Sequence, residues 1–116
     1  MSATLGVLPP KPMPAPPFGT DRTYAIAFDV DTDELRKRYV SSSFKHAYDD
    51  IRAVLQGHGF EWQQGSVYFG GTTVTPVTCV LAVQDLQRRY HWFGGSVRDI
   101  RMLRIEENSN LVPAIS

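Results

Sequence analysis

Apolar and polar side chains alternate over residues 24–30, within the string "YAIAFDV". Because successive side chains of a β-strand point to opposite faces, this pattern predicts a strand with two unlike faces. The bulky face would carry Tyr24, Ile26, Phe28 and Val30, and the other face Ala25, Ala27 and Asp29. The strand thus needs cover on its bulky side, and its small-residue side ends in a carboxylate.

Helical spacing follows this strand. A short helical turn is predicted over 34–39, after which Ser41, Ser42 and Ser43 are candidate N-caps for a long helix. The inner face of that helix would hold Phe44, Tyr48, Ile51 and Leu55, and glycines at 57 and 59 end it. A second helix is predicted from Thr75-Pro76 to about residue 90, because proline suits the first helical position after a threonine cap. Its inner face would hold Cys79, Val83, Leu86 and Tyr90.

Two short strand-like runs lie between these helices, in "FEWQQGSVYFGG", and meet at Gln64-Gly65, which predicts a tight hairpin or a bulge. The string "SVRDIRMLRIEE" predicts a last strand. The order strand, helix, strand, strand, helix, strand is that of an α+β, ferredoxin-like βαββαβ sandwich with a four-stranded antiparallel sheet.

Two helices can cover only one face of such a sheet, so we expect them on the bulky face of the first strand. The last strand has apolar residues on both faces: Ile100 and Met102 share one parity, Leu103 and Ile105 the other. A strand that is apolar on both faces needs cover on both. We therefore predict a homodimer that packs through the open sheet face, with Asp29 at the end of an intersubunit crevice.

Composition sets the limits of the domain. Residues 1–22 hold six of the eight prolines and are predicted to be a flexible Pro-rich leader, followed by one domain over 23–110 and a tail over 111–116. Twelve basic and twelve acidic side chains cancel, so the bulk charge of a nucleic-acid binder is missing. Cys79 is the single cysteine, which excludes a disulfide framework and, with no apolar span or signal peptide, favours a cytoplasmic location.

Three strings carry a family resemblance: "YAIAFD", "AYDDIRAVLQGHGFEWQQGSVY" and "WFGGSVRDIRMLRIEE". Over about 23–110 the chain resembles the virulence-associated protein D (VapD) family, which is similar in fold to the CRISPR-associated Cas-two nucleases. The resemblance implies a homodimeric endoribonuclease that acts as the toxin-like component of a bacterial toxin–antitoxin or plasmid-associated system, with RNA as substrate and an antitoxin protein as candidate partner. It also maps the family's catalytic aspartate onto Asp29.

RNA cleavage needs a group that activates a 2′-hydroxyl or water and a group that neutralises charge on the phosphate. Asp29 and its symmetry mate could hold Mg²⁺, the one candidate cofactor, or one carboxylate could act as a base whose pKa the other raises. Four acidic residues near an RNA phosphate favour the metal. Asp31 and Asp33 are better explained as helix-start charges.

Other residues have two interpretations each. Ser66 and Tyr68 would point into the dimer crevice, where their hydroxyls could bind phosphate or make interface hydrogen bonds. Arg98 and Arg101 could clamp phosphate, although an Arg–Asp pair with Asp99 is the stronger interpretation. Base stacking or ordinary packing would suit Trp62 and Tyr24. For the three histidines, His46, His58 and His91, surface roles are expected.

Two functions therefore remain open: an endoribonuclease that cleaves single-stranded RNA, and a non-catalytic dimeric binding module for an antitoxin, a protein partner or nucleic acid. Zero net charge favours the module, whereas the carboxylate on the small-residue face favours the enzyme.

Overall fold

The computed structural model describes residues 23–39 and 43–116. The Pro-rich leader and two of the candidate N-caps, Ser41 and Ser42, lie outside these residues. The elements in chain order are β1 (Thr23–Val30), α1 (Thr32–Arg38), α2 (His46–Gly57), β2 (Phe60–Gln64), β3 (Val67–Gly70), α3 (Pro76–Arg89), α4 (Phe93–Ser96), β4 (Val97–Ile105) and the 3-10 helix η1 (Val112–Ile115).

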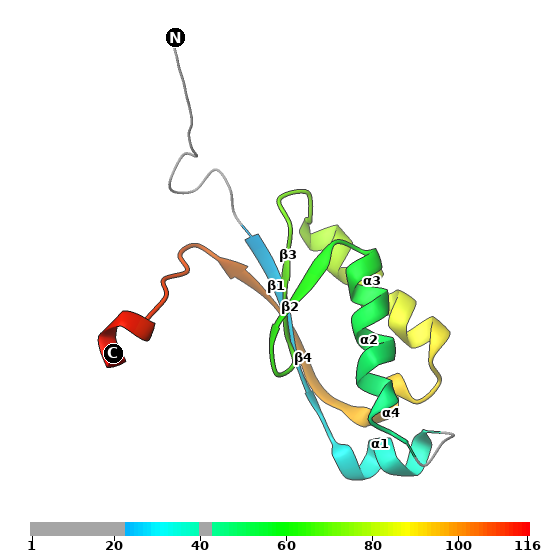
Figure 1. Ribbon diagram of the computed structural model, residues 1–116. Helices are drawn as coiled ribbons and strands as arrows, with labels where there is room; N and C mark the ends of the chain where they lie inside the picture. The colour runs from blue at the N-terminus through cyan, green and yellow to red at the C-terminus, as the bar shows by residue number, and fades with distance from the viewer. Residues whose placement is uncertain (1–22, 40–42) are drawn as a thin grey trace.

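The four strands form one antiparallel sheet in the order β2-β3-β1-β4. With α2 and α3 on one side of it, this is the predicted α+β, ferredoxin-like arrangement, and that prediction is confirmed. Figure 1 shows the sheet nearly edge-on, with the helices on one side and the segment after β4 projecting away on the other. Among the described residues, no long helix covers the other face of the sheet, and the segment after β4 borders that face at Val67 and Phe69.

The predicted division of β1 into two faces is confirmed. Ile26 and Phe28 belong to the buried core between sheet and helices, and Tyr24 and Val30 pack against that core. Asp29, on the other face, is exposed. The core also takes in apolar residues of every long helix: Ala47, Ile51, Val54, Leu55, Cys79, Ala82 and Leu86.

Two helix starts differ from prediction. Helix α1 begins at Thr32, earlier than expected, because the Asp31 side chain accepts hydrogen bonds from the backbone N–H groups of Asp33 and Glu34 and so caps it. Helix α2 begins only at His46, and its N-cap Lys45 makes no side-chain cap bond. Phe44, expected on the inner face of α2, precedes the helix and lies under the Arg36 guanidinium, 4.8 Å from its ring centroid.

The hairpin and the second long helix follow prediction. The turn between β2 and β3 contains Gly65 at a φ of 50°, a left-handed conformation that glycine adopts without strain, and the register shifts between Trp62 and Gln64. Helix α3 starts with a Thr75–Thr78 capping box and proline in its first turn. The "HWFGG" string ends α3 as expected, but Phe93–Ser96 then form the short α4.

Candidate active site at the end of β1

Asp29 stands near the end of β1 on the open face, in register with Asp99 of β4. Residues directly opposite on antiparallel strands have Cβ atoms about 4.5–5.5 Å apart, so the two carboxylates are neighbours. The register shifts between Asp29 and Val30, which bends the strand at the carboxylate. Like charges placed opposite one another destabilise a sheet, so this arrangement calls for a cation or a functional reason.

Arginine neutralises only one of the two carboxylates. Arg101, opposite Ala27, donates from Nε to both oxygens of Asp99, at 2.9 and 3.1 Å. The predicted Arg–Asp pair is therefore confirmed for Arg101. The side chain of Asp29 has no hydrogen bond or ion pair within residues 23–39 and 43–116. Its carboxylate is thus exposed, unpaired and available to a ligand.

Asp31 marks the edge of the site. Its carboxylate caps α1 and lies 3.4 Å from Arg98 Nε, and its backbone N–H donates to the Ser96 carbonyl at 2.7 Å. The backbone hydrogen bond to Glu34, with help from Arg98, lowers the pKa of Asp31. The interpretation of Asp31 as a helix-start charge is confirmed, and Asp33, which pairs with Arg36 at 3.2 Å, has a similar place. Arg98 is held at Asp31 and not at Asp99, where the sequence placed it.

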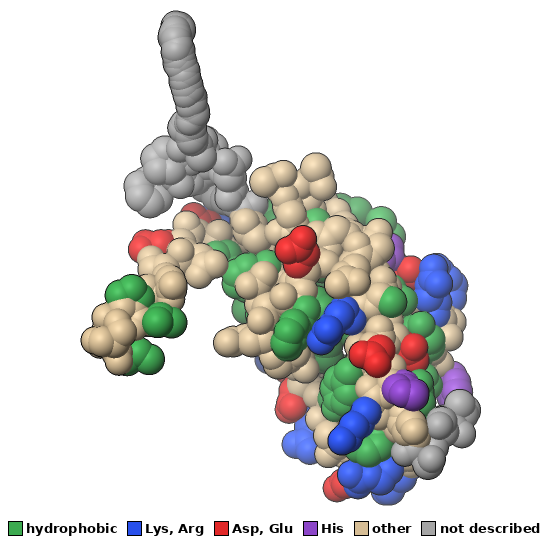
Figure 2. Space-filling view, in the orientation of Figure 1, with side chains coloured by type: hydrophobic (Ala, Val, Ile, Leu, Met, Phe, Trp, Pro, Cys, Tyr) green, Lys and Arg blue, Asp and Glu red, His purple; other side chains and the backbone are tan. Residues whose placement is uncertain are grey.

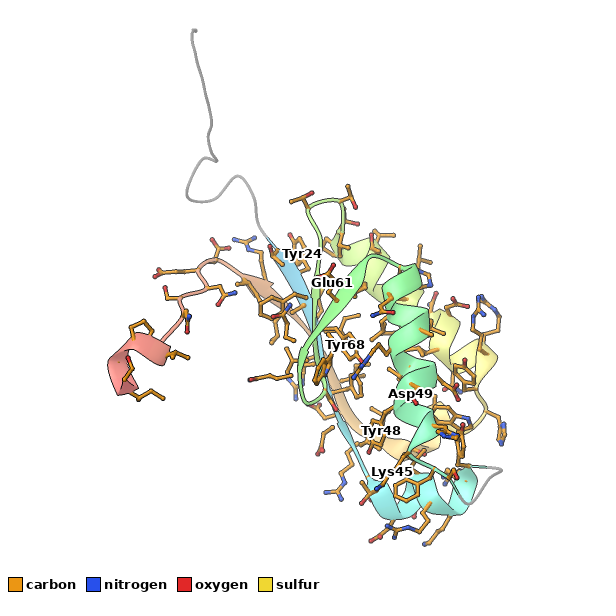
Figure 3. The ribbon with its side chains drawn as sticks, in the orientation of Figure 1. Tyr24, Lys45, Tyr48, Asp49, Glu61 and Tyr68 are labelled. Carbon is orange, nitrogen blue, oxygen red and sulfur yellow. The ribbon has the colours of Figure 1, made fainter. Side chains whose placement is uncertain are left out.

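The Ser66 carbonyl accepts from the N–H of Phe28 at 3.1 Å, so its backbone lies beside the end of β1. By the strand register Ser66 shares the parity of Tyr68 and Phe28, and its predicted role in phosphate binding stays a prediction. The position predicted for Tyr68 is wrong. Tyr68 pairs with Ile26 on the helix-covered face, is 3% exposed and stacks with Phe28 at a centroid distance of 6.1 Å. The sequence correctly placed Tyr68 on one face of its strand and Val67 and Phe69 on the other. It assigned Tyr68 to the wrong side of the sheet, because Val67 and Phe69 are the residues opposite Ala27 and Ala25 on the open face. Figure 3 labels Tyr68 together with Tyr48, which α2 directs toward the sheet.

The sequence missed a polar cluster between α2 and α3. Asp85 is 6% exposed, and His58 Nε2 lies 2.8 Å from its Oδ2. Arg89 donates from Nε at 2.9 Å, and Arg88 is a third partner. The hydrogen bond from His58 is the main cause of a lowered pKa for Asp85. The prediction of a surface role is therefore wrong for His58. The sequence did hold a signal for this contact, since His58 directly follows a predicted helix and Asp85 takes an inner position on the next one.

Charge over the rest of the surface is mixed. Figure 2 shows basic, acidic and apolar side chains interspersed over one face, with no broad patch of one sign. Within the described residues, no helix is long and apolar enough to span a membrane. The same residues contain no group of three or more histidine, cysteine or acidic side chains placed to hold a metal ion. Any cation here would therefore rest on Asp29 and Asp99.

The fold and the site thus define a small α+β domain with an unpaired carboxylate at the end of its first strand. Comparison with known sequences adds the family. No family model matches the chain. It is 50% identical over 93 residues, 80% of this chain and 99% of the relative, to "Endoribonuclease VapD 2" of Riemerella anatipestifer. It is 51% identical over 92 residues, 79% of this chain and 95% of the relative, to "Endoribonuclease VapD homolog" of Helicobacter pylori.

A more distant relative, "Endoribonuclease VapD" of Dichelobacter nodosus, is 39% identical over 92 residues, which span 79% of this chain and 96% of the relative. These relatives are matched over nearly their whole length, so the likeness concerns the entire domain. The chain belongs to the VapD family, as the sequence strings predicted.

Proposed function

We propose that this protein is an endoribonuclease that cleaves single-stranded RNA with Asp29 as its catalytic carboxylate. The relatives are named endoribonucleases, which supports the reaction class. One observation carries the assignment of the site: the Asp29 side chain is exposed, has no partner among the described residues and lies opposite a second carboxylate. Two opposed carboxylates destabilise the sheet, and no ion pair to Asp29 among the described residues offsets this cost.

In the proposed mechanism, Asp29 accepts the proton of the attacking 2′-hydroxyl or water, because its carboxylate is exposed and no ion-pair partner among the described residues blocks its approach to the substrate. Arg101 lies one residue pair further along the same face, and Arg98 lies at the strand end. Both are largely exposed, with side chains 71% and 62% accessible, so they can turn from their aspartates toward a phosphate.

The residues fit a weakly held Mg²⁺. Mg²⁺ usually binds one or two carboxylates and keeps several waters, and Asp29 with Asp99 supplies that number. When bound there, the ion would neutralise charge that builds on the phosphate.

A homodimer through the open face is part of the proposal. On this face the neighbours of Ala25 and Ala27 are Phe69 and Val67 on β3 and Leu103 on β4; Ala25 is fully buried, whereas Leu103 is 46% exposed. A second copy is the cheapest cover for such a surface, and it would bring two Asp29 side chains to one crevice. The toxin role, with an antitoxin as partner and a cytoplasmic location, rests on the family resemblance alone.

A circular single-stranded RNA tests this function, since only an endonuclease can open it. We expect the purified protein to convert the circle to linear products, to leave a matched RNA duplex and single-stranded DNA intact, and to lose activity in EDTA and regain it with Mg²⁺. Activity that persists in EDTA would reject the metal and favour base catalysis by Asp29. Tight binding without any cleavage would reject the enzyme and favour the binding module.

A further inference from the structure

Trp62 and Arg52 form a second polar site, away from Asp29. Trp62 lies on edge strand β2, and Arg52 on α2 places its guanidinium 4.4 Å from the centroid of the indole ring. An open hollow beside them is lined by Arg52, Gln56, Gly59, Phe60, Glu61 and Trp62. Figure 3 labels Glu61 on β2, the strand that packs next to α2.

The Trp62 ring is fixed in place, but one hydrogen-bond donor of this site lacks a partner among the described residues. The indole N–H of Trp62 donates to the Gly65 carbonyl at 2.8 Å, which fixes the ring, but 45% of the residue is exposed. The Nε of Arg52 is enclosed and has no hydrogen-bond partner among the residues that the structure describes. Buried donors are normally paired, so the unpaired Arg52 Nε is unusual. Large aromatic rings normally bury more of their surface, so the exposed part of the Trp62 ring is the surface that a ligand can reach.

The lining indicates the class of ligand. Aromatic rings and arginine planes stack on nucleobases, which all present a flat π-face. Glu61 would repel a phosphate but can accept hydrogen bonds from the N–H groups at a base edge. Gln56 offers both a donor and an acceptor to the same edge. We propose that Arg52 and Trp62 form a nucleobase subsite for single-stranded RNA, a proposal that rests on RNA being the substrate.

The sheet register gives the distance from this subsite to the reaction. Trp62 pairs with Tyr68, and Tyr68 pairs with Ile26, so Trp62 lies two strands and three residues from Asp29. Spacings of about 4.8 Å between strands and about 3.3 Å between residues place the two Cα positions roughly 14 Å apart. This is the straight line through the sheet, so an RNA strand that joins the two sites spans at least about four nucleotides at roughly 3.4 Å each.

The two sites lie on opposite faces of the sheet. Trp62 shares the face of Tyr68 and Ile26, which the helices cover, whereas Asp29 is on the open face. An RNA strand that occupies both must pass around the β2 edge. The subsite stays accessible when a second copy covers the open face, and it binds a base several nucleotides away from the cleaved bond.

Fluorescence anisotropy of labelled single-stranded RNA tests the subsite without cleavage, with Asp29→Asn as the common background. Trp62→Ala should weaken binding of a long oligonucleotide by about 10-fold or more, the order expected from losing one stacked base. Trp62→Phe keeps a ring and should retain most of the affinity. Leu81→Ala, an exposed residue of α3, is the matched control and should change nothing.

Intrinsic fluorescence gives a readout that needs no unstable variant. Of the two tryptophans, Trp92 is 4% exposed, so stacking of a base should quench mainly Trp62. Long RNA should quench the unsubstituted protein and leave Trp62→Phe nearly unchanged. An unaltered affinity in folded Trp62→Ala, or quenching by long RNA that persists in Trp62→Phe, would reject the subsite. Cleavage is not measured here, so an RNA that binds through Trp62 but is never cut rejects the proposed enzyme and leaves the subsite standing.

Discussion

Leu35 provides a quantitative test of how α1 is tied to the domain. It is the buried residue of α1, at 0% exposure, and belongs to the core shared by the sheet and the long helices. Leu35→Ala removes the equivalent of three methylene groups, which at about 0.8 kcal/mol each is roughly 2.4 kcal/mol of lost burial. The cavity left behind adds to this, so we expect a total loss of about 2.5–5 kcal/mol.

Urea unfolding followed by circular dichroism measures this loss as a lower midpoint at an unchanged slope. Leu81→Ala is the matched control, because the same atoms are removed from a residue that is 53% exposed, and its effect should stay within about 0.5 kcal/mol. Equal stability losses for the two variants would refute the placement of α1 on the core. Since α1 carries the Asp31 cap beside Asp29, cleavage per folded molecule should survive at low temperature.

Three further predictions concern assembly, pH and capping. Phe69→Glu puts a charge on the open face and should halve the mass measured by light scattering while circular dichroism stays native; an unchanged dimer mass would reject this interface. The lowered pKa of Asp85 contributes stability that is complete above the unfolded pKa near 4 and is lost as the pH falls through the folded pKa. Below about pH 4 the melting temperature of Asp85→Asn should therefore fall less steeply with decreasing pH than that of the wild type, and parallel plots of melting temperature against pH would contradict this. Thr75→Ala removes the side-chain cap of α3 and should cost about 0.5–2 kcal/mol in urea unfolding, whereas Thr72→Ala, before the cap, should cost less.

Local patterns predicted most of the fold. The alternation around Ile26 and Phe28 identified the face that the helices cover, and Thr75-Pro76 located the start of α3, because both signals depend on neighbouring residues alone. The start of α2 was missed since the serines before it could equally cap a helix or end a loop. Tyr68 was misplaced because alternation separates two faces but does not say which one the helices cover.

The site was predicted less completely than the fold. Asp29 could be singled out because an acidic residue interrupts the small face of a strand. Its opposition to Asp99 depends on a register that joins the two ends of the domain, and the contact between His58 and Asp85 depends on how α2 packs on α3. Neither pairing has a local signal. The distance between the Arg52–Trp62 pair and Asp29 likewise appears only once β2, β3 and β1 are in register.

The most direct test of the central claim is the single-turnover cleavage rate of Asp29→Asn beside Asp33→Asn. Both changes remove one exposed carboxylate, but Asp33 pairs with Arg36 on α1 and has no place in the proposed chemistry. We expect Asp29→Asn to fold normally and to cleave about 10²-fold or more slowly, the range for loss of a general base, with Asp33→Asn near wild type. Equal rates for wild type and folded Asp29→Asn would contradict the catalytic role of Asp29.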